Sequence, residues 1–285
     1  MWRPMKQALA GDRFWLLAWI LGLGAMMAWD SAYLNAPAFV QVQEAFVHSI
    51  AAGLLVVLLS LFLGWAAALL LYYGEERRAG WVRVIHFFLD LIRSMPQIVG
   101  LLTGYVLLTI FLDRGIVATQ TGQILWMSFV VSIFLFIEVV DVISERIHHY
   151  AASDFVPAML GCGIGEWRIV NVEILWRNCR AHLLNKAVSV FGMAIFLQCS
   201  VDFVVSVGLS TDVSLTNVPM TLGSLLAKMD SKQDILAMGI IFSDPSYFPN
   251  LFIRHLQGLS TAFFIIFTLL CVARISEGIA RRYRL

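Results

Sequence analysis

The sequence predicts an all-α membrane protein with six transmembrane helices. Of its 285 residues, 60% are hydrophobic and only 14% are charged, whereas soluble domains have roughly 45–50% apolar residues. Several apolar stretches reach about 20 residues, the length that crosses a bilayer as a helix. Lysines and arginines gather in alternate connecting segments, which is typical of multi-pass membrane proteins.

The spans are predicted at 14–34, 50–73, 81–112, 122–147, 184–207 and 259–277. A basic segment, 1–13, precedes the first span. No cleavage site of small residues follows that apolar run, so we interpret it as a retained membrane helix rather than a signal peptide. A mixed connector is expected over 31–48, and a long polar outer segment over 208–258 separates the last two spans.

The third span carries a polar stripe and an internal proline. Its polar residues recur at intervals of three and four, which places them on one helix face: Arg83, His86, Asp90 and Arg93. Pro96 follows, and proline inside a helix removes a hydrogen bond and bends the axis. We therefore expect one bent span.

The distribution of positive charge predicts the orientation of the chain. Of the 20 lysines and arginines, 16 fall in the proposed inner segments and 4 in the outer ones. Positive residues concentrate on the cytoplasmic side of membrane proteins. This pattern favours both termini in the cytoplasm, together with the segment 154–176.

The segment 154–176 is a polar island between two long apolar spans. Its charged residues exclude it from hydrocarbon: Asp154, Glu166, Arg168 and Glu173. Three glycines at its centre, Gly161, Gly163 and Gly165, permit a sharp turn between two short helices at 154–160 and 167–175. Each helix has an apolar face. Spacing alone fits either a docking element or an ordinary cytoplasmic loop.

Ten residues of this segment match a known motif in order: Asp154, Phe155, Val156, Ala158, Gly163, Trp167, Arg168, Ile169, Ile174 and Leu175. The segment resembles the "EAA" loop of ABC importer permeases of the peptide/nickel (dipeptide and oligopeptide permease) family. Four positions depart from that pattern. Pro157 stands at the motif glutamate, Met159 at the second alanine, Glu173 at the histidine and Trp176 at the closing proline.

Other parts of the chain resemble the same family more weakly. They are Arg93-Ser94-Met95-Pro96, Val207-Gly208-Leu209, the seven residues from Thr221 to Ala227, and the five from Ile275 to Ile279. Together they resemble the "C"-type subunit of a permease pair. The family's polar segment between its first two helices is absent, and the outer stretch 237–256 is longer than usual.

The resemblance implies a type I ABC importer permease fold, like that of the methionine importer, in the bacterial inner membrane. It also implies a second permease subunit in a heterodimer, two cytoplasmic ATPase subunits and an external solute-binding protein. The residues that would couple to the ATPase are Phe155, Val156, Pro157, Ala158, Gly161, Gly163, Gly165 and Glu166. Short peptides are the first substrate class that it suggests.

No phosphate-binding GxxxxGK[ST] loop occurs in the chain. ATP and Mg²⁺ would therefore bind in the partner subunits, and we expect no cofactor, metal site, catalytic residue or enzymatic activity here. Four scattered cysteines and the adjacent His148 and His149 do not form a metal motif, because neighbouring helical residues point apart. A net charge of +1 gives no indication of a nucleic-acid partner.

Polar residues within the spans are candidates for a translocation path. Gln198 and Asp202 lie four residues apart in the fifth span, and polar groups at membrane depth usually face a cavity or a partner helix. Alternatively, Asp202 sits at the outer interface. Glu138 is a third candidate; with Asp141 and Glu145 it either pairs with Arg83 and Arg93 or forms a solvated face.

Two other functional classes remain open at this point. An ion-coupled secondary transporter would use Asp202 or Glu138 as its proton site. A non-transporting membrane regulator would keep the coupling loop to sense an ATPase.

Overall fold

A computed structural model describes residues 11–78, 80–117, 119–208, 219–228, 239–240, 243–247, 249 and 256–283. The described residues are helical and contain no strand. Among them, five helices are long and apolar enough to cross a membrane, or six if one bent pair forms a single span. The all-α membrane class is confirmed at this level. The basic residues Arg3 and Lys6 lie outside the described part.

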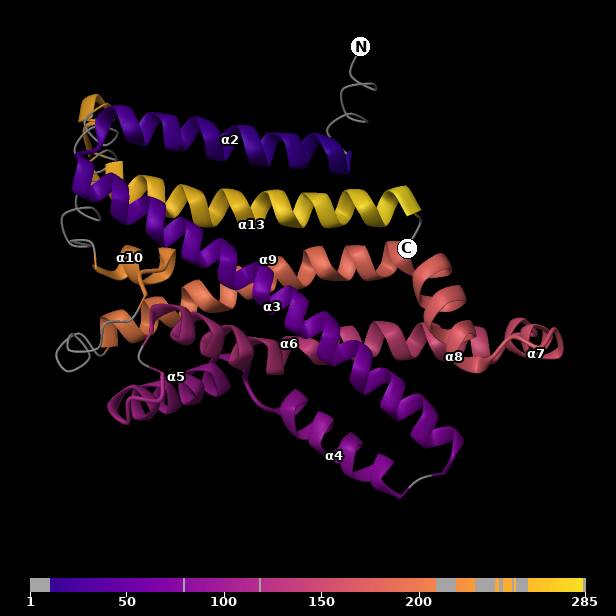
Figure 1. Cartoon of the computed structure of the whole chain (residues 1–285). Helices are drawn as coiled ribbons and strands as arrows, with labels where there is room; N and C mark the ends of the chain where they lie inside the picture. The colour runs from indigo at the N-terminus through magenta and orange to yellow at the C-terminus, as the bar shows by residue number, and fades with distance from the viewer. Residues whose placement is uncertain are drawn as a thin grey trace, which may run out of the picture.

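The first and last long helices pack side by side (Figure 1). Helix α2 (Asp12–Tyr33) contacts α13 (Leu256–Tyr283), and the Trp19 indole donates a hydrogen bond to Thr268 Oγ1 at 3.1 Å. An ion pair of 2.7 Å joins Arg282 to Asp12. The start of α2 and the end of α13 therefore lie at the same end of the bundle.

The second span is one long helix, α3 (Ala36–Glu76), which crosses the bundle diagonally (Figure 1). The prediction of a connector over 31–48 is therefore wrong, because most of that stretch is helical. The Asn35 side chain caps the helix by accepting from the Ala38 amide, and Pro37 fits the first turn. A helix of 41 residues is about 60 Å long, twice the thickness of the hydrocarbon core.

The predicted third span is two helices, α4 (Trp81–Ser94) and α5 (Gln97–Asp113), at an angle of 98°. The bend expected at Pro96 is confirmed, but it is a break rather than a kink. Met95 is extended, with φ −83° and ψ 133°, because proline disfavours helical geometry in the residue before it. The polar stripe of α4 faces its neighbours in part: Arg93 pairs with Asp141.

Helices α6 (Gln120–Ala151) and α9 (Arg180–Gly208) form the centre of the bundle with α3. Their buried aliphatic side chains, among them Leu135, Ile143 and Val190, make up the main hydrophobic core. A second core joins α3 and α9 to α13 around Phe264. Each of these spans is longer by several residues than the sequence predicted.

The predicted outer segment 208–258 is described only in pieces. Helix α10 (Leu222–Lys228) packs against α9, α13 and α3, and a short 3-10 turn, η3, covers Pro245–Tyr247. Gly223 lets α10 approach α9, because a Cβ atom there would lie 2.3 Å from the Cys199 carbonyl oxygen. Leu209 and most of 237–256 lie outside the described residues.

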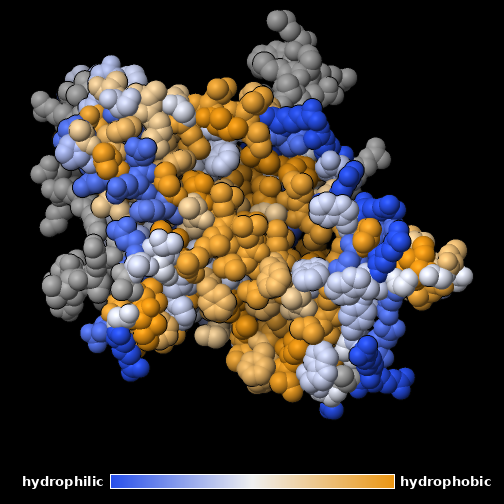
Figure 2. Space-filling model, in the orientation of Figure 1, coloured by the Kyte–Doolittle hydropathy of each residue, from blue (hydrophilic) through white to orange (hydrophobic). Residues whose placement is uncertain are grey.

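The surface is banded, as expected for a protein in a bilayer. Figure 2 shows hydrophobic side chains over the middle of one face and hydrophilic residues gathered toward both ends. Many of the exposed apolar side chains belong to the long helices, for example Leu21 on α2 and Leu58 on α3. These two are more than half exposed, which in a bilayer means contact with lipid.

Candidate functional site: an exposed helix-turn-helix and a buried polar cluster

The predicted helix-turn-helix is present between α6 and α9. Helix α7 (Phe155–Gly161) comes first, and a turn over 162–165 leads to α8 (Glu166–Arg168), which continues as a π-helix, η1 (Ile169–Asn178). The two helical pieces match the predicted ranges within about three residues; the π-helical winding was not predicted. Figure 1 shows α7 projecting from the end of the bundle that holds the start of α2 and the end of α13. We call this the α7 end.

Gly163 makes the turn. Its φ of +79° is a left-handed conformation that glycine adopts without strain. The Gly163 amide donates to the Leu160 carbonyl at 2.9 Å, and the Ile164 amide donates to the Met159 carbonyl at 3.2 Å. This pair of bonds is the Schellman arrangement that ends helices at a glycine.

The other two glycines do not act as predicted. Gly161 is the last residue of α7, and Gly165 precedes α8 with an ordinary φ of −66°. Neither would meet a neighbour within 4 Å if it carried a Cβ atom. Only one of the three glycines therefore sets the turn, so the sequence-based expectation is corrected for Gly161 and Gly165.

The second half of the loop is fixed to the bundle. Ile169, Val170 and Ile174 are fully buried in the main core. The Trp65 indole of α3 donates to Asn171 Oδ1 at 2.8 Å. Trp167 packs against the ring of Tyr73, with 6.5 Å between ring centroids. Motion of η1 would therefore be passed to α3.

Helix α7 is attached on one side only. Val156 is buried, and Phe155 is half-buried against the Tyr150 ring of α6 at 5.5 Å. Pro157, Ala158 and Leu160 are exposed, and Leu160 is 47% exposed. An apolar surface on a short projecting helix at a hydrophilic end has no obvious role in a solvated loop.

Glu166 joins α8 to the end of α3. It hydrogen-bonds to Glu76 and to Tyr72. The pKa of Glu166 is raised, first by partial burial and then by the hydrogen bond and charge of Glu76; the Tyr72 hydroxyl and Arg77 act in the opposite direction. Two carboxyl groups share a hydrogen bond only when one is protonated, so this contact depends on pH.

The opposite end of the bundle holds a buried polar cluster around Asp202, which is 3% exposed. Its carboxylate accepts from the Tyr105 hydroxyl of α5 at 3.1 Å and from Thr221 Oγ1, just before α10, at 2.6 Å. Ser49 Oγ of α3 accepts from the Leu222 amide at 2.9 Å. These contacts join α3, α5, α9 and α10, so Asp202 lies inside the bundle near the end of α9.

Of the other two path candidates, Gln198 is buried and Glu138 is partly buried. Gln198 is 7% exposed, and its Oε1 atom is buried without a hydrogen-bond partner among the described residues. Glu138 accepts from Lys186 of α9 at 2.7 Å, not from Arg83 or Arg93 as one sequence interpretation suggested. The proposed pairing with Arg93 holds for Asp141 alone of that group.

Sequence reasoning missed most of the partners of these residues. Tyr105, Thr221 and Ser49 lie far from Asp202 along the chain, and no local pattern marks them. A cluster at the α7 end was missed for the same reason: Glu75 accepts from His86 at 3.0 Å and from His148 at 3.3 Å. His86 belonged to the predicted polar stripe, but neither His148 nor Glu75 was expected to contact it.

A comparison with models of known protein families finds no match to this chain, and a comparison with curated proteins finds none either.

Proposed function

We propose that this protein is the permease subunit of an ATP-driven importer, coupled through segment 154–176 to separate ATPase subunits. The observation that carries the proposal is the exposed apolar face of α7, which projects from the α7 end on a glycine-set turn. The motif resemblance of the same segment supports it. Because the chain has no phosphate-binding loop of its own, ATP and Mg²⁺ would be bound by those subunits.

The contacts of the loop suggest how force would reach the membrane. An ATPase that pushes α7 displaces η1, which is held to α3 by Trp65 and runs directly into α9. At the other end of α9, Asp202 holds α5 and α10. Tilting α9 would therefore strain the buried cluster and open the opposite end. Such alternating access requires that ATP binding favour one of two states.

The proposed assembly contains a second permease, two cytoplasmic ATPases and an external solute-binding protein in the bacterial inner membrane. The start of α2 and the end of α13 lie on the same side as α7, which suits a cytoplasmic position for all three. Short peptides are the proposed substrate, on the family resemblance alone. Among the described path candidates, Gln198 has a buried acceptor oxygen, Oε1, that could accept a hydrogen bond from a substrate.

An ion-coupled transporter is a second candidate because Asp202 is a buried carboxylate in a candidate span. Buried carboxylates in membranes often carry protons. Uptake by such a transporter would survive ATP depletion and collapse with an uncoupler. Uptake by the proposed importer would show the opposite response.

The experiment uses matched variants of the turn. Gly163→Asp forces a side chain into a strained conformation, whereas Gly165→Asp places the same side chain at the N-cap of α8, where aspartate is favoured. Both variants should insert normally. Gly163→Asp should disconnect ATP hydrolysis from uptake, and Gly165→Asp should retain coupled uptake. Coupled uptake at full rate in Gly163→Asp would contradict the proposal. ATPase association with no solute flux in the unmodified assembly would instead indicate a regulator.

A further inference from the structure

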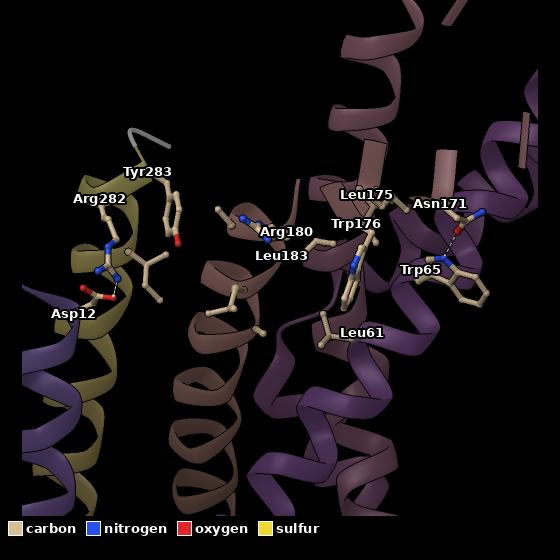
Figure 3. A pocket seen from close by; sticks show the side chains of 15 residues that line it. Asp12, Leu61, Trp65, Asn171, Leu175, Trp176, Arg180, Leu183, Arg282 and Tyr283 are labelled. Atoms are coloured by element: carbon tan, nitrogen blue, oxygen red, sulfur yellow. Dashed lines mark hydrogen bonds and ion pairs between the residues drawn. The ribbon is translucent and has the colours of Figure 1, made fainter. Parts of the chain in front are cut away.

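A cavity of about 910 Å³ lies at the α7 end, bounded by α2, α3, α6, η1, α9 and α13. It is at the upper end of the volumes that small-molecule sites have, roughly 300–1,000 Å³. Figure 3 shows that its wall brings together residues from both ends of the chain and from the segment after the coupling turn. None of the predicted site residues lines it.

Arg180 places a positive charge in the cavity. Arg180, the first residue of α9, is exposed and makes no hydrogen bond or ion pair with any other described residue. Arg282 lines the same cavity, but Asp12 already pairs with it at 2.7 Å. In Figure 3, Arg180 lies between Tyr283 of α13 and Trp176 of η1. The amino end of α9 adds a partial positive charge beside it.

The rest of the lining is mostly apolar and extends along α9 toward the middle of the bundle. Leu184 and Ala187 lie one and two turns along α9 from Arg180, and Leu61 and Ile143 line the wall from α3 and α6. Trp176 is 74% exposed at its rim. A single cation at one end, aromatic rings beside it and aliphatic side chains below suit a ligand with a negative head and a hydrocarbon tail.

We propose that this cavity binds an anionic glycerophospholipid, with the phosphate on Arg180 and an acyl chain along Leu184 and Ala187. Basic pockets between transmembrane helices are known sites for anionic headgroups. The inference does not rest on the proposed transport function. Bound lipid would contact Trp176 and Tyr283 at once, and so would bridge η1 and α13.

The experiment measures lipid binding to the full chain in mild detergent by native mass spectrometry. Phosphatidylglycerol is compared with phosphatidylcholine of the same acyl chains, and inorganic phosphate is added as a competitor. Phosphatidylglycerol should bind the unmodified protein more tightly than phosphatidylcholine. Arg180→Gln should weaken phosphatidylglycerol binding about five-fold, the effect of losing one arginine near an anionic headgroup, and Arg180→Lys should retain binding.

Two further variants distinguish the contribution of charge to lipid binding from that of the free volume in the cavity. Arg168→Gln removes an exposed arginine from the coupling segment, outside the cavity, and should leave binding unchanged. Ala187→Phe fills the apolar part without changing charge and should weaken binding of both lipids. Each variant is first checked for a single size-exclusion peak and unchanged helical circular dichroism.

Three results would overturn the proposal. Equal binding of the two lipids by the unmodified protein would show that Arg180 does not select an anionic headgroup, a conclusion that holds even if Arg180→Gln failed to fold. Displacement of phosphatidylglycerol by inorganic phosphate at equal concentration would show that the acyl chain does not contribute to binding. Cross-linking of Trp176→Cys to a second copy of the chain in excess phosphatidylglycerol would show that protein covers the cavity. None of these measurements involves uptake or ATP hydrolysis.

Discussion

The two ends of the bundle depart from the usual burial pattern in opposite ways. At the α7 end, Leu160 and its neighbours expose apolar side chains where the surface is otherwise hydrophilic. At the α10 end, Asp202 and Thr221 bury polar groups among helices. Either departure is more informative than the ordinary core between them. An exposed apolar face suits a partner that is absent, whereas a satisfied buried cluster fixes the position of elements that are present.

This comparison separates effects on stability from effects on partner binding. Substitutions at Asp202, Tyr105 or Thr221 should cost folding free energy, because these three buried side chains already hydrogen-bond to one another. Substitutions on the exposed face of α7 should cost almost none. The predictions below are ordered by their expected effect on stability.

Asp202→Ala should have the largest effect. It removes the carboxylate to which the buried hydroxyls of Tyr105 and Thr221 donate, and each lost hydrogen bond costs roughly 1–3 kcal/mol. We expect a loss of about 3 kcal/mol, measured by thermal unfolding in detergent. Asp202→Asn keeps one acceptor and should lose less. An unchanged unfolding temperature in Asp202→Ala would mean that the cluster does not hold these helices.

Gly223→Ala should come next. The new Cβ atom would lie 2.3 Å from the Cys199 carbonyl oxygen, which belongs to the backbone and cannot rotate away. We expect α10 to shift, at a cost of about 1–3 kcal/mol, and the buried Cys199 thiol to react with maleimide in a Cys162→Ser background. Gly24→Ala, which meets nothing within 4 Å, is the control and should leave Cys199 protected.

Trp65→Phe should loosen the coupling segment without unfolding the bundle. It removes the hydrogen bond to Asn171, worth about 1 kcal/mol. Hydrogen exchange of the amides in 169–178 should accelerate about five-fold. Trp176→Phe changes an indole that is 74% exposed and should not alter exchange there. Similar acceleration in both variants would show that the Trp65–Asn171 hydrogen bond does not hold η1 to α3.

The contact of α8 with α3 should weaken as pH rises. The pKa of Glu166 is raised in the folded protein, so the detached segment gives up this proton more readily than the docked one. The docked form is therefore favoured at low pH and loses that advantage as pH rises through the raised pKa. Exchange rates in 166–178, corrected for intrinsic pH dependence, should show this trend. Glu166→Gln should abolish it.

Leu160→Ser should have the smallest effect on stability, below about 0.5 kcal/mol, because the side chain is 47% exposed. Its effect on association with the proposed ATPase subunit should nevertheless be large. Met159→Ser provides the contrast, because Met159 packs against the core and its loss should reduce stability. Retained ATPase binding in Leu160→Ser would place the contact elsewhere.

Local signals in the sequence explain why the helix-turn-helix could be predicted. The charges between Asp154 and Glu173 exclude that segment from the membrane, Gly163 marks the turn, and Pro96 marks the break between α4 and α5. Each depends on residues close together in the chain. The start of α3 was missed because Gln41, Gln43 and Glu44 interrupt its apolar residues. The hydropathy of this stretch is therefore too low to predict a span, although the Asn35 cap begins the helix there.

The polar cluster and the cavity at the α7 end could not be predicted in the same way. Asp202 was recognised as unusual, but Tyr105 lies 97 residues away from it and Thr221 lies 19 residues away across a segment without clear periodicity. The cavity joins Asp12 to Tyr283 and Arg180. Such contacts arise from the packing of whole helices, which hydropathy and motif spacing do not determine.

The most direct test of the central claim is cross-linking at α7 in the intact assembly. A photoreactive residue replaces Leu160 on α7 in one sample and the exposed Phe62 on α3 in another. After purification and illumination, mass spectrometry should find an ATP-binding protein attached at position 160 and lipid or no protein at position 62. The account would be contradicted if no ATP-binding protein were cross-linked at position 160. It would also be contradicted if position 160 could be reached only by reagents confined to the external side.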